Sequence, residues 1–398
     1  MLSIRNFHVI KYLIIIILYQ VQFYFDGSSY SLYLLVLNIT FLGGSSLGAV
    51  LLNGKSNKLF LKLNRSDLLV LVFFFGYLAS FIKGVLSINS FIVMVFYLVL
   101  IWVNIKIDSE HNPSLFNSYV KSIVMIMIIN MILFLIGISS SSLINKYPEM
   151  QIRLVELIGL NLNRFNFFIF SNFAYTSMLY CIPLIVFQKR SKKLLNLLVI
   201  LLAAISLILL DARGPFLAAI CVIIFGRFLY DKSINKQLIF VSVIAIIPLI
   251  TNTILILLNL DDAEALSLLS RRDAIWNITI SNYSPDLFEL IFGFGYIGQY
   301  SSGISELYSN LFPGYGNQEQ ISVHNSYLQI LLDYGLLGLV LLFVTIRKLI
   351  KRFKEKNKIT PFLVLLFLLI CGVTDLSIQP NNINMLTAFL VIANSKFV

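Results

Sequence analysis

The chain has 398 residues, of which 58% are hydrophobic and only 12% carry a charge, and its formal net charge is +11. Soluble proteins carry charges on about a quarter of their residues, so this composition excludes an ordinary water-soluble enzyme. A helix crosses the apolar part of a bilayer with roughly 20 apolar residues. The sequence contains many windows of this kind, and we predict an all-α, polytopic transmembrane helix bundle. We treat residues 1–398 as a single integral membrane domain.

Twelve windows have the apolarity of a membrane span. They lie at about 9–26, 30–52, 67–86, 88–105, 119–138, 166–187, 194–211, 215–230, 238–259, 325–346, 361–378 and 382–395. The last two are short for a span. No small-residue cleavage site follows the first window, so we expect it to be retained rather than removed as a signal peptide.

The basic residues are distributed very unevenly between alternate loops. If the N-terminus is cytoplasmic, only seven of the 30 Lys and Arg residues fall on the outer side. These are Lys83, Lys146, Arg153, Arg164, Arg213, Arg271 and Arg272. Basic loops stay in the cytoplasm during insertion, which predicts that both termini are cytoplasmic. The positive charge is then a topology signal that also suits anionic lipid headgroups, and we expect no nucleic-acid partner.

Two predicted external segments interrupt the apolar pattern. The first, at 139–165, contains a serine run and a stretch, IRLVELIGL, with the spacing of a helix that lies on the membrane surface. The second, at 260–323, precedes the tenth span. A loop of that length is usually functional. We expect a short helix at about 262–281 near its start, with Asp261 or Asp262 as its N-cap.

Several predicted external arginines lie close to the membrane, where an arginine is costly. Arg213 occupies a tight junction between two spans, and Arg272 lies in the long loop. One explanation is simple ion pairing, of Arg213 with Asp211 and of Arg272 with Asp273. The other is phosphate binding, since the planar guanidinium fork matches phosphate oxygens. A polyprenyl-linked sugar diphosphate presents such a group at the outer face of a bacterial membrane.

His324 opens the tenth predicted span, in the stretch SVHNSYLQILLDYGLLG at 322–338. The other two histidines, His8 and His111, are expected to face solvent on the cytoplasmic side. An isolated histidine at a helix start is more often a cap or a surface residue than a catalyst. Its place beside the long loop nevertheless favours His324 as a general base, because neutral imidazole can accept a proton from a sugar hydroxyl.

Asp333 follows His324 by two and a half helical turns, on the opposite face of the predicted helix. It either pairs with another helix or lines a cavity. Gly335 and Gly338 form a G-x-x-G pattern that permits close helix packing.

Four local sequence patterns follow one another between residues 163 and 343. They are NRFNFFIFSNFA at 163–174, DARGPFLAA at 211–219, RDAIWNITI at 272–280 with IFGFG at 291–295, and HNSYLQILLDYGLLGLVLLF at 324–343. Together they resemble the O-antigen ligase and polymerase family of polytopic glycosyltransferases, over roughly residues 160 to 345. Ala212 stands where the family often has Ser, Pro215 stiffens the same turn, and Asp333 replaces a more usual Glu.

The resemblance implies a glycosyltransferase in the bacterial plasma (inner) membrane. Its donor would be a glycan on undecaprenyl diphosphate, with His324 as general base and with Arg213 and Arg272 holding the diphosphate. Candidate substrate-binding residues are Arg164, Arg271, Asn325, Tyr327 and Trp276. We expect no cofactor and no metal, because no carboxylate-rich cluster is apparent among the external segments. A chain-length regulator and a flippase are candidate partners.

Within the family, we favour an O-antigen or capsular polysaccharide polymerase, whose acceptor is a lipid-linked repeat unit, because polymerases of this kind occur in both bacterial envelope types. An O-antigen ligase, which transfers the glycan to lipid A core, is the alternative, but it requires an outer membrane. A flippase or other transporter is an alternative of another class. It would need ionisable residues deep in several spans, whereas here they gather in the predicted external loops.

Overall fold

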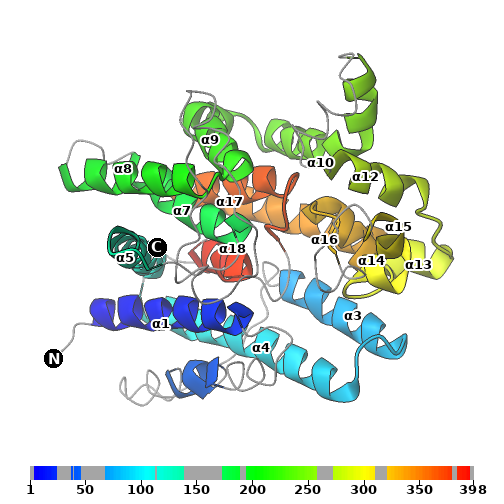
Figure 1. Ribbon diagram of the computed structural model, residues 1–398, viewed down its shortest axis with the longest axis horizontal. Coiled ribbons are helices and arrows are strands. Elements are labelled where there is room, and N and C mark those ends of the chain that lie inside the picture. Colours follow the sequence, from blue (N-terminus) through cyan, green and yellow to red (C-terminus); the bar gives the residue numbers. More distant parts are fainter. Residues whose placement is uncertain are drawn as a thin grey trace.

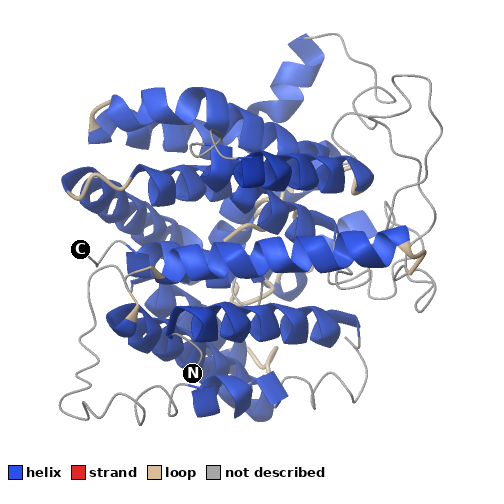
Figure 2. Ribbon diagram, turned by 90° about the vertical axis from the view of Figure 1, so that its left-hand side faces the viewer, coloured by secondary structure: helices blue, strands red, loops and turns tan. Residues whose placement is uncertain are grey.

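The computed structural model describes the chain over ten ranges, and every regular element within them is a helix (Figures 1 and 2). The described ranges are 4–24, 37–38, 40–45, 68–112, 114–138, 173–188, 194–257, 272–309, 321–378 and 383–394. The prediction of an all-α protein is confirmed for these residues.

Among the residues that the structure describes, fifteen helices have defined bounds, and α16 is the longest of them. In chain order they are α1 (Ile4–Tyr24), α3 (Leu68–Ile82), α4 (Ile88–His111), α5 (Leu115–Leu135), α7 (Phe173–Gln188), α8 (Leu194–Leu209), α9 (Arg213–Asp231), α10 (Ile234–Leu257), α12 (Arg272–Ser281), α13 (Leu287–Phe292), α14 (Gly298–Ser301), α15 (Ile304–Ser309), α16 (Ser326–Glu355), α17 (Ile359–Cys371) and α18 (Ile383–Asn394). A helix stands at each predicted span; in the second, at 30–52, the structure describes only residues 37–38 and 40–45, which are helical.

Within the described ranges, five helices are long and apolar enough to cross a membrane, and several shorter apolar helices accompany them. The five are Ile88–Glu110, Leu115–Leu135, Arg213–Asp231, Ile234–Thr251 and Ser326–Glu355. Large apolar side chains are exposed along their outer faces, as Ile239, Val243 and Ile246 are on α10. Spacings of three and four residues put these side chains on one face of the helix, where they can contact lipid. The chain is therefore a polytopic membrane protein; the count of twelve spans and the orientation of the termini stay predictions.

α16 lies between two groups of helices (Figure 1). It contacts α3 on one side, α10 and α17 on the other, and the short helices α13 and α14 of the long predicted loop. The described part of that loop is thus packed against a membrane helix. The proposed N-caps Asp261 and Asp262 and the whole of 139–165 lie outside the described residues.

A buried polar cluster joins α1 to α4. The Lys11 ammonium lies 2.8 Å from Asp108 Oδ2, and the Tyr12 hydroxyl donates to the same oxygen at 3.0 Å. Lys11 also donates to Asn104. His8, with only 2% of its surface exposed, has Nδ1 3.8 Å from Asp108 Oδ1. The prediction that His8 faces solvent is wrong, because its ring is buried next to Asp108 of α4.

Removing one partner of this cluster should destabilise the protein strongly, since a lone buried charge costs about 3–5 kcal/mol. We expect Lys11→Met to lower the unfolding temperature of the detergent-solubilised protein by several degrees. The double variant Lys11→Met with Asp108→Leu should recover much of that loss, because no unpaired charge remains. Additive losses in thermal unfolding of the single and double variants would contradict the pairing.

Candidate functional site

The beginning of α16 is joined to the turn that follows α17. Asn325 caps α16 through its side-chain oxygen, which accepts from the backbone N–H groups of Tyr327 and Leu328 at 2.9 and 2.8 Å. The side-chain amide of Asn325 also donates to the carbonyl of Val373 at 2.6 Å. One residue therefore satisfies two orphan donors of the helix start and fixes its position against the turn.

Ser326 completes this joint. Its backbone N–H donates to Gly372 O at 2.7 Å, and its hydroxyl donates to Asp375 O at 2.9 Å. The same hydroxyl oxygen accepts from the backbone N–H of Ser377 at 2.9 Å. Asn325 and Ser326 are both fully buried. The turn, residues 372–378, is consequently tied to the two residues that follow His324.

The predicted span at 361–378 is wrong at its C-terminal end, since α17 ends at Cys371. The remaining residues form the turn, and Asp375 on this turn pairs with Arg272 at the start of α12, at 2.9 Å. The alternative pairing of Arg272 with Asp273 is not what the described residues show. Local sequence suggested the neighbouring carboxylate, but the packed turn brings a distant one closer to the guanidinium.

His324 lies directly before the Asn325 cap, in a left-handed backbone conformation with φ of 49°. Histidine is one of the few residue types that adopt this region with some frequency. Burial lowers the pKa of His324 to about 3, and the positive charge of Arg272 contributes in the same direction. The imidazole is therefore neutral at physiological pH and lies within the field of the Arg272 guanidinium.

The junction between α8 and α9 reaches the same turn. A Cβ placed on Gly214 would lie 3.2 Å from Thr374 Oγ1 and 4.0 Å from Asp375 Oδ2. Arg213 precedes this glycine, about a third exposed, with Nε 3.7 Å from Asp211 Oδ2. The ion pair expected between these two residues is present, but it is long and leaves guanidinium surface exposed.

α16 is interrupted at Gly335, whose φ of 62° and ψ of −161° cannot continue a helix. The freed carbonyls of Leu332 and Asp333 accept from the backbone N–H groups of Phe294 and Gly295, at 2.6 and 3.1 Å. The glycine-rich segment 291–298 therefore docks into the break in α16. This pairing satisfies polar backbone groups that have no access to water in a membrane.

Asp333 secures the same segment with its side chain. Its Oδ1 accepts from the backbone N–H of Gly298 at 2.7 Å and from the Gln329 side-chain amide at 2.8 Å. The carboxyl is fully buried. Of the two alternatives for Asp333, the structure favours a link to another element, and that element is the loop.

The predicted site residues separate into three groups. His324, Arg272 and the Arg213–Gly214 junction surround the 372–378 turn. Three further candidates are buried: Asn325 is the cap, the Tyr327 hydroxyl donates to Leu369 O at 2.7 Å, and the Trp276 indole donates to Val323 O at 3.0 Å. Their substrate contacts stay predictions, and their present bonds support the site. Arg164 and Arg271 lie outside the described residues.

Asp375 is the residue that the sequence-based site omitted. An ionisable residue near the end of a predicted span was a usable signal, but it did not indicate which arginine the carboxylate would meet. Burial raises the pKa of Asp375 to about 6, while the Arg272 charge and a hydrogen bond from Thr374 oppose this rise.

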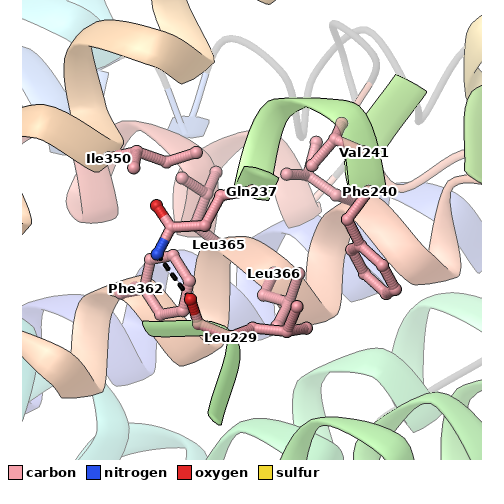
Figure 3. A pocket seen from close by; sticks show the side chains of 9 residues that line it. Leu229, Gln237, Phe240, Val241, Ile350, Phe362, Leu365 and Leu366 are labelled. Carbon is pink, nitrogen blue, oxygen red and sulfur yellow. Dashed lines mark hydrogen bonds between the residues drawn. The ribbon is translucent and has the colours of Figure 1, made fainter. Parts of the chain in front are cut away.

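A separate apolar pocket lies between the C-terminal parts of α9 and α16, the N-terminal part of α10, and α17 (Figure 3). Its lining residues are Leu229, Gln237, Phe240, Val241, Ile350, Phe362, Leu365, Leu366 and Leu369. The Gln237 amide donates to Leu229 O at 2.6 Å across it. This pocket contains no titratable side chain and is not part of the candidate site.

Residues 198–343 match the O-antigen ligase family. The match covers more than a third of the chain and includes Arg213, Arg272 and His324, but it ends before Asp375. No curated protein and no solved structure matches the chain significantly. Residues 198–343 thus form an O-antigen ligase family domain in a polytopic membrane protein, and membership of this family implies an enzyme that transfers glycans.

Acidification should leave His324 neutral well below the ordinary histidine range. At about pH 5, where an exposed histidine is mostly protonated, we expect its ring NMR signals to keep their neutral positions. Comparison of ring-labelled wild-type protein with His324→Gln identifies its signals among those of the three histidines. Because the folded-state pKa is depressed, protonation favours the unfolded chain, and stability should fall as pH drops below about 6.5. A titration midpoint near 6.5 in the folded protein would show that the imidazole is solvated.

Gly335→Ala should disrupt the docking of 291–298, whereas Gly303→Ala should be much milder. Both glycines have positive φ, of 62° and 73°, so both substitutions strain the backbone. At Gly335 the new Cβ would also lie 2.4 Å from Ile291 O, while at Gly303 nothing lies within 4 Å. We expect a clearly larger loss of unfolding temperature and of transfer activity at position 335. Equal losses for the two variants would mean that the docked loop contributes little.

Proposed function

We propose that this protein is a polysaccharide polymerase of the O-antigen or capsular type. It transfers a growing glycan from undecaprenyl diphosphate to a hydroxyl of a lipid-linked repeat unit. The reaction takes place at the outer face of the bacterial plasma membrane, with both chain termini in the cytoplasm. The proposal is supported most by one observation: His324, Arg272 and the Arg213–Gly214 junction, which come from separate parts of the family domain, surround a single turn.

The arrangement suits displacement at an anomeric carbon. The acceptor oxygen forms a bond to that carbon while the bond to the diphosphate oxygen breaks, and the diphosphate leaves with the electron pair. His324 takes the hydroxyl proton. Arg272 and Arg213 hold the diphosphate oxygens and stabilise the negative charge that develops on them. Diphosphate is already a good leaving group, so this displacement forms no covalent intermediate with the enzyme.

Donor binding would adjust the basicity of His324. In the empty site, burial and the Arg272 charge both lower the pKa of this imidazole. A diphosphate bound beside Arg272 brings negative charge that offsets the second cause and favours the imidazolium. The imidazole therefore becomes a better base when the donor is present, which couples proton transfer to occupation of the site.

An O-antigen ligase is the second candidate, because the matching family carries that description. The two functions share the donor and the displacement and differ in the acceptor. A transporter is not favoured, since the family transfers glycans. Purified protein in lipid nanodiscs, supplied with lipid-linked repeat units alone, should produce a ladder of longer lipid-linked chains. If no ladder forms and the repeat units are transferred only to added lipid A core, the protein is a ligase.

The roles of His324 and Arg272 can be tested in the same assay. His324→Ala should reduce chain extension by about a thousandfold, within the 10²–10⁴ range of general base catalysis. Arg272→Lys should be severely impaired as well, because an ammonium lacks the bidentate fork. Arg347→Lys, on the distant half of α16, is the matched control and should retain activity. Wild-type ladders from His324→Ala would rule out the base assignment.

A further inference from the structure

We infer that Asp375 is the positioning residue for Arg272: a carboxylate, fixed by the turn after α17, that holds this guanidinium ready for the donor diphosphate. The inference rests on the proposed function and adds a residue beyond the family domain to it. Arg272 and Asp375 are 103 positions apart in the chain, so only the folded bundle brings them together.

Asp375 is held much more firmly than its partner. Its backbone N–H donates to Cys371 O at 2.9 Å, and its carbonyl accepts from the Ser326 hydroxyl at 2.9 Å. The carboxylate is 4% exposed, whereas the Arg272 side chain is 24% exposed. A buried and anchored anion beside a partly exposed cation determines where that cation lies.

The ion pair leaves most of the guanidinium available. Asp375 Oδ1 accepts from Nη2 of Arg272 at 2.9 Å. A guanidinium has five N–H donors in one plane, and a diphosphate oxygen pair can engage those along another edge. Holding one edge reduces the rotamer freedom that the side chain would otherwise lose when the donor binds.

The same turn connects Arg272 to the base and to the second arginine. Ser326, which accepts the Ser377 N–H and donates to the Asp375 carbonyl, lies two residues after His324. Gly214, next to Arg213, abuts Thr374 on the turn. A substitution at Asp375 would therefore change how tightly the protein binds the donor diphosphate, although Asp375 does not contact the reacting atoms. This is the behaviour of a positioning residue.

The test is a double-variant cycle on donor binding. The full-length protein in nanodiscs is titrated with a short-chain polyprenyl diphosphate, and transfer kinetics are measured separately with lipid-linked repeat units. We expect Asp375→Asn to weaken diphosphate binding about tenfold, a loss of about 1.4 kcal/mol, and to raise KM for the donor. In an Arg272→Gln background, the same substitution should change binding by less than about twofold.

Two further variants separate positioning from general stability. Asp375→Glu retains the carboxylate and should recover part of the affinity lost in Asp375→Asn. Glu355→Gln breaks an exposed ion pair with Lys351 and should leave binding and KM unchanged. If the Asp375 and Arg272 substitutions reduce the binding affinity independently, so that their fold-changes multiply, the inference is overturned. It is also overturned if Asp375→Asn lowers the yield of folded protein but leaves the affinity for the diphosphate unaltered. No diphosphate binding by the wild type would overturn it too.

The binding arm also separates this inference from the proposed function. If the wild-type protein binds the polyprenyl diphosphate but produces no glycan transfer, the proposed function fails. The coupling between Asp375 and Arg272 is then still decided by the binding cycle. If transfer occurs and the binding cycle shows no coupling, the inference fails and the polymerase proposal stands.

Discussion

The joint between the start of α16 and the turn after α17 is the interaction on which the candidate site depends. Asn325 and Ser326 supply it, through hydrogen bonds to Gly372, Val373 and Asp375. A helix start leaves several N–H groups unsatisfied, and a buried start must find partners within the protein. Here the partners lie on an element more than 40 residues away, so the same bonds that cap the helix also assemble the site.

The break in α16 follows the same physical rule. Gly335 interrupts the helix, and the carbonyls that lose their helical donors take backbone N–H groups from residues 294 and 295. A polar loop is thereby held against an apolar helix without unpaired backbone groups. The G-x-x-G pattern was interpreted as a helix-packing surface. The atoms nearest to a Cβ placed on Gly338 belong to Tyr334 and Ile330 of α16 itself, and Gly335 serves as a docking point for a loop.

Charges are placed in two different ways in this molecule. The Lys11–Asp108 pair is buried on both sides and joins α1 to α4. In the Arg272–Asp375 pair only the carboxylate is buried, whereas the guanidinium is partly exposed. Burial of this carboxylate raises the pKa of Asp375 to about 6. The first arrangement is suited to fixing helices, because neither charge can reach a ligand. The second leaves a guanidinium surface that an anion can approach.

Much about this protein follows from its sequence alone. Apolar runs of about 20 residues require helices in a bilayer, since a spanning chain must satisfy its backbone internally, and the HNSYLQILLDYG and DARGP patterns indicate the family domain that the 198–343 match shows. Only the tertiary structure decided that α17 ends at Cys371, that Arg272 meets Asp375 rather than Asp273, and that His8 is buried. These outcomes depend on long-range packing: which distant group lies nearest a charge is set by how helices pack, and no local pattern of residues encodes it.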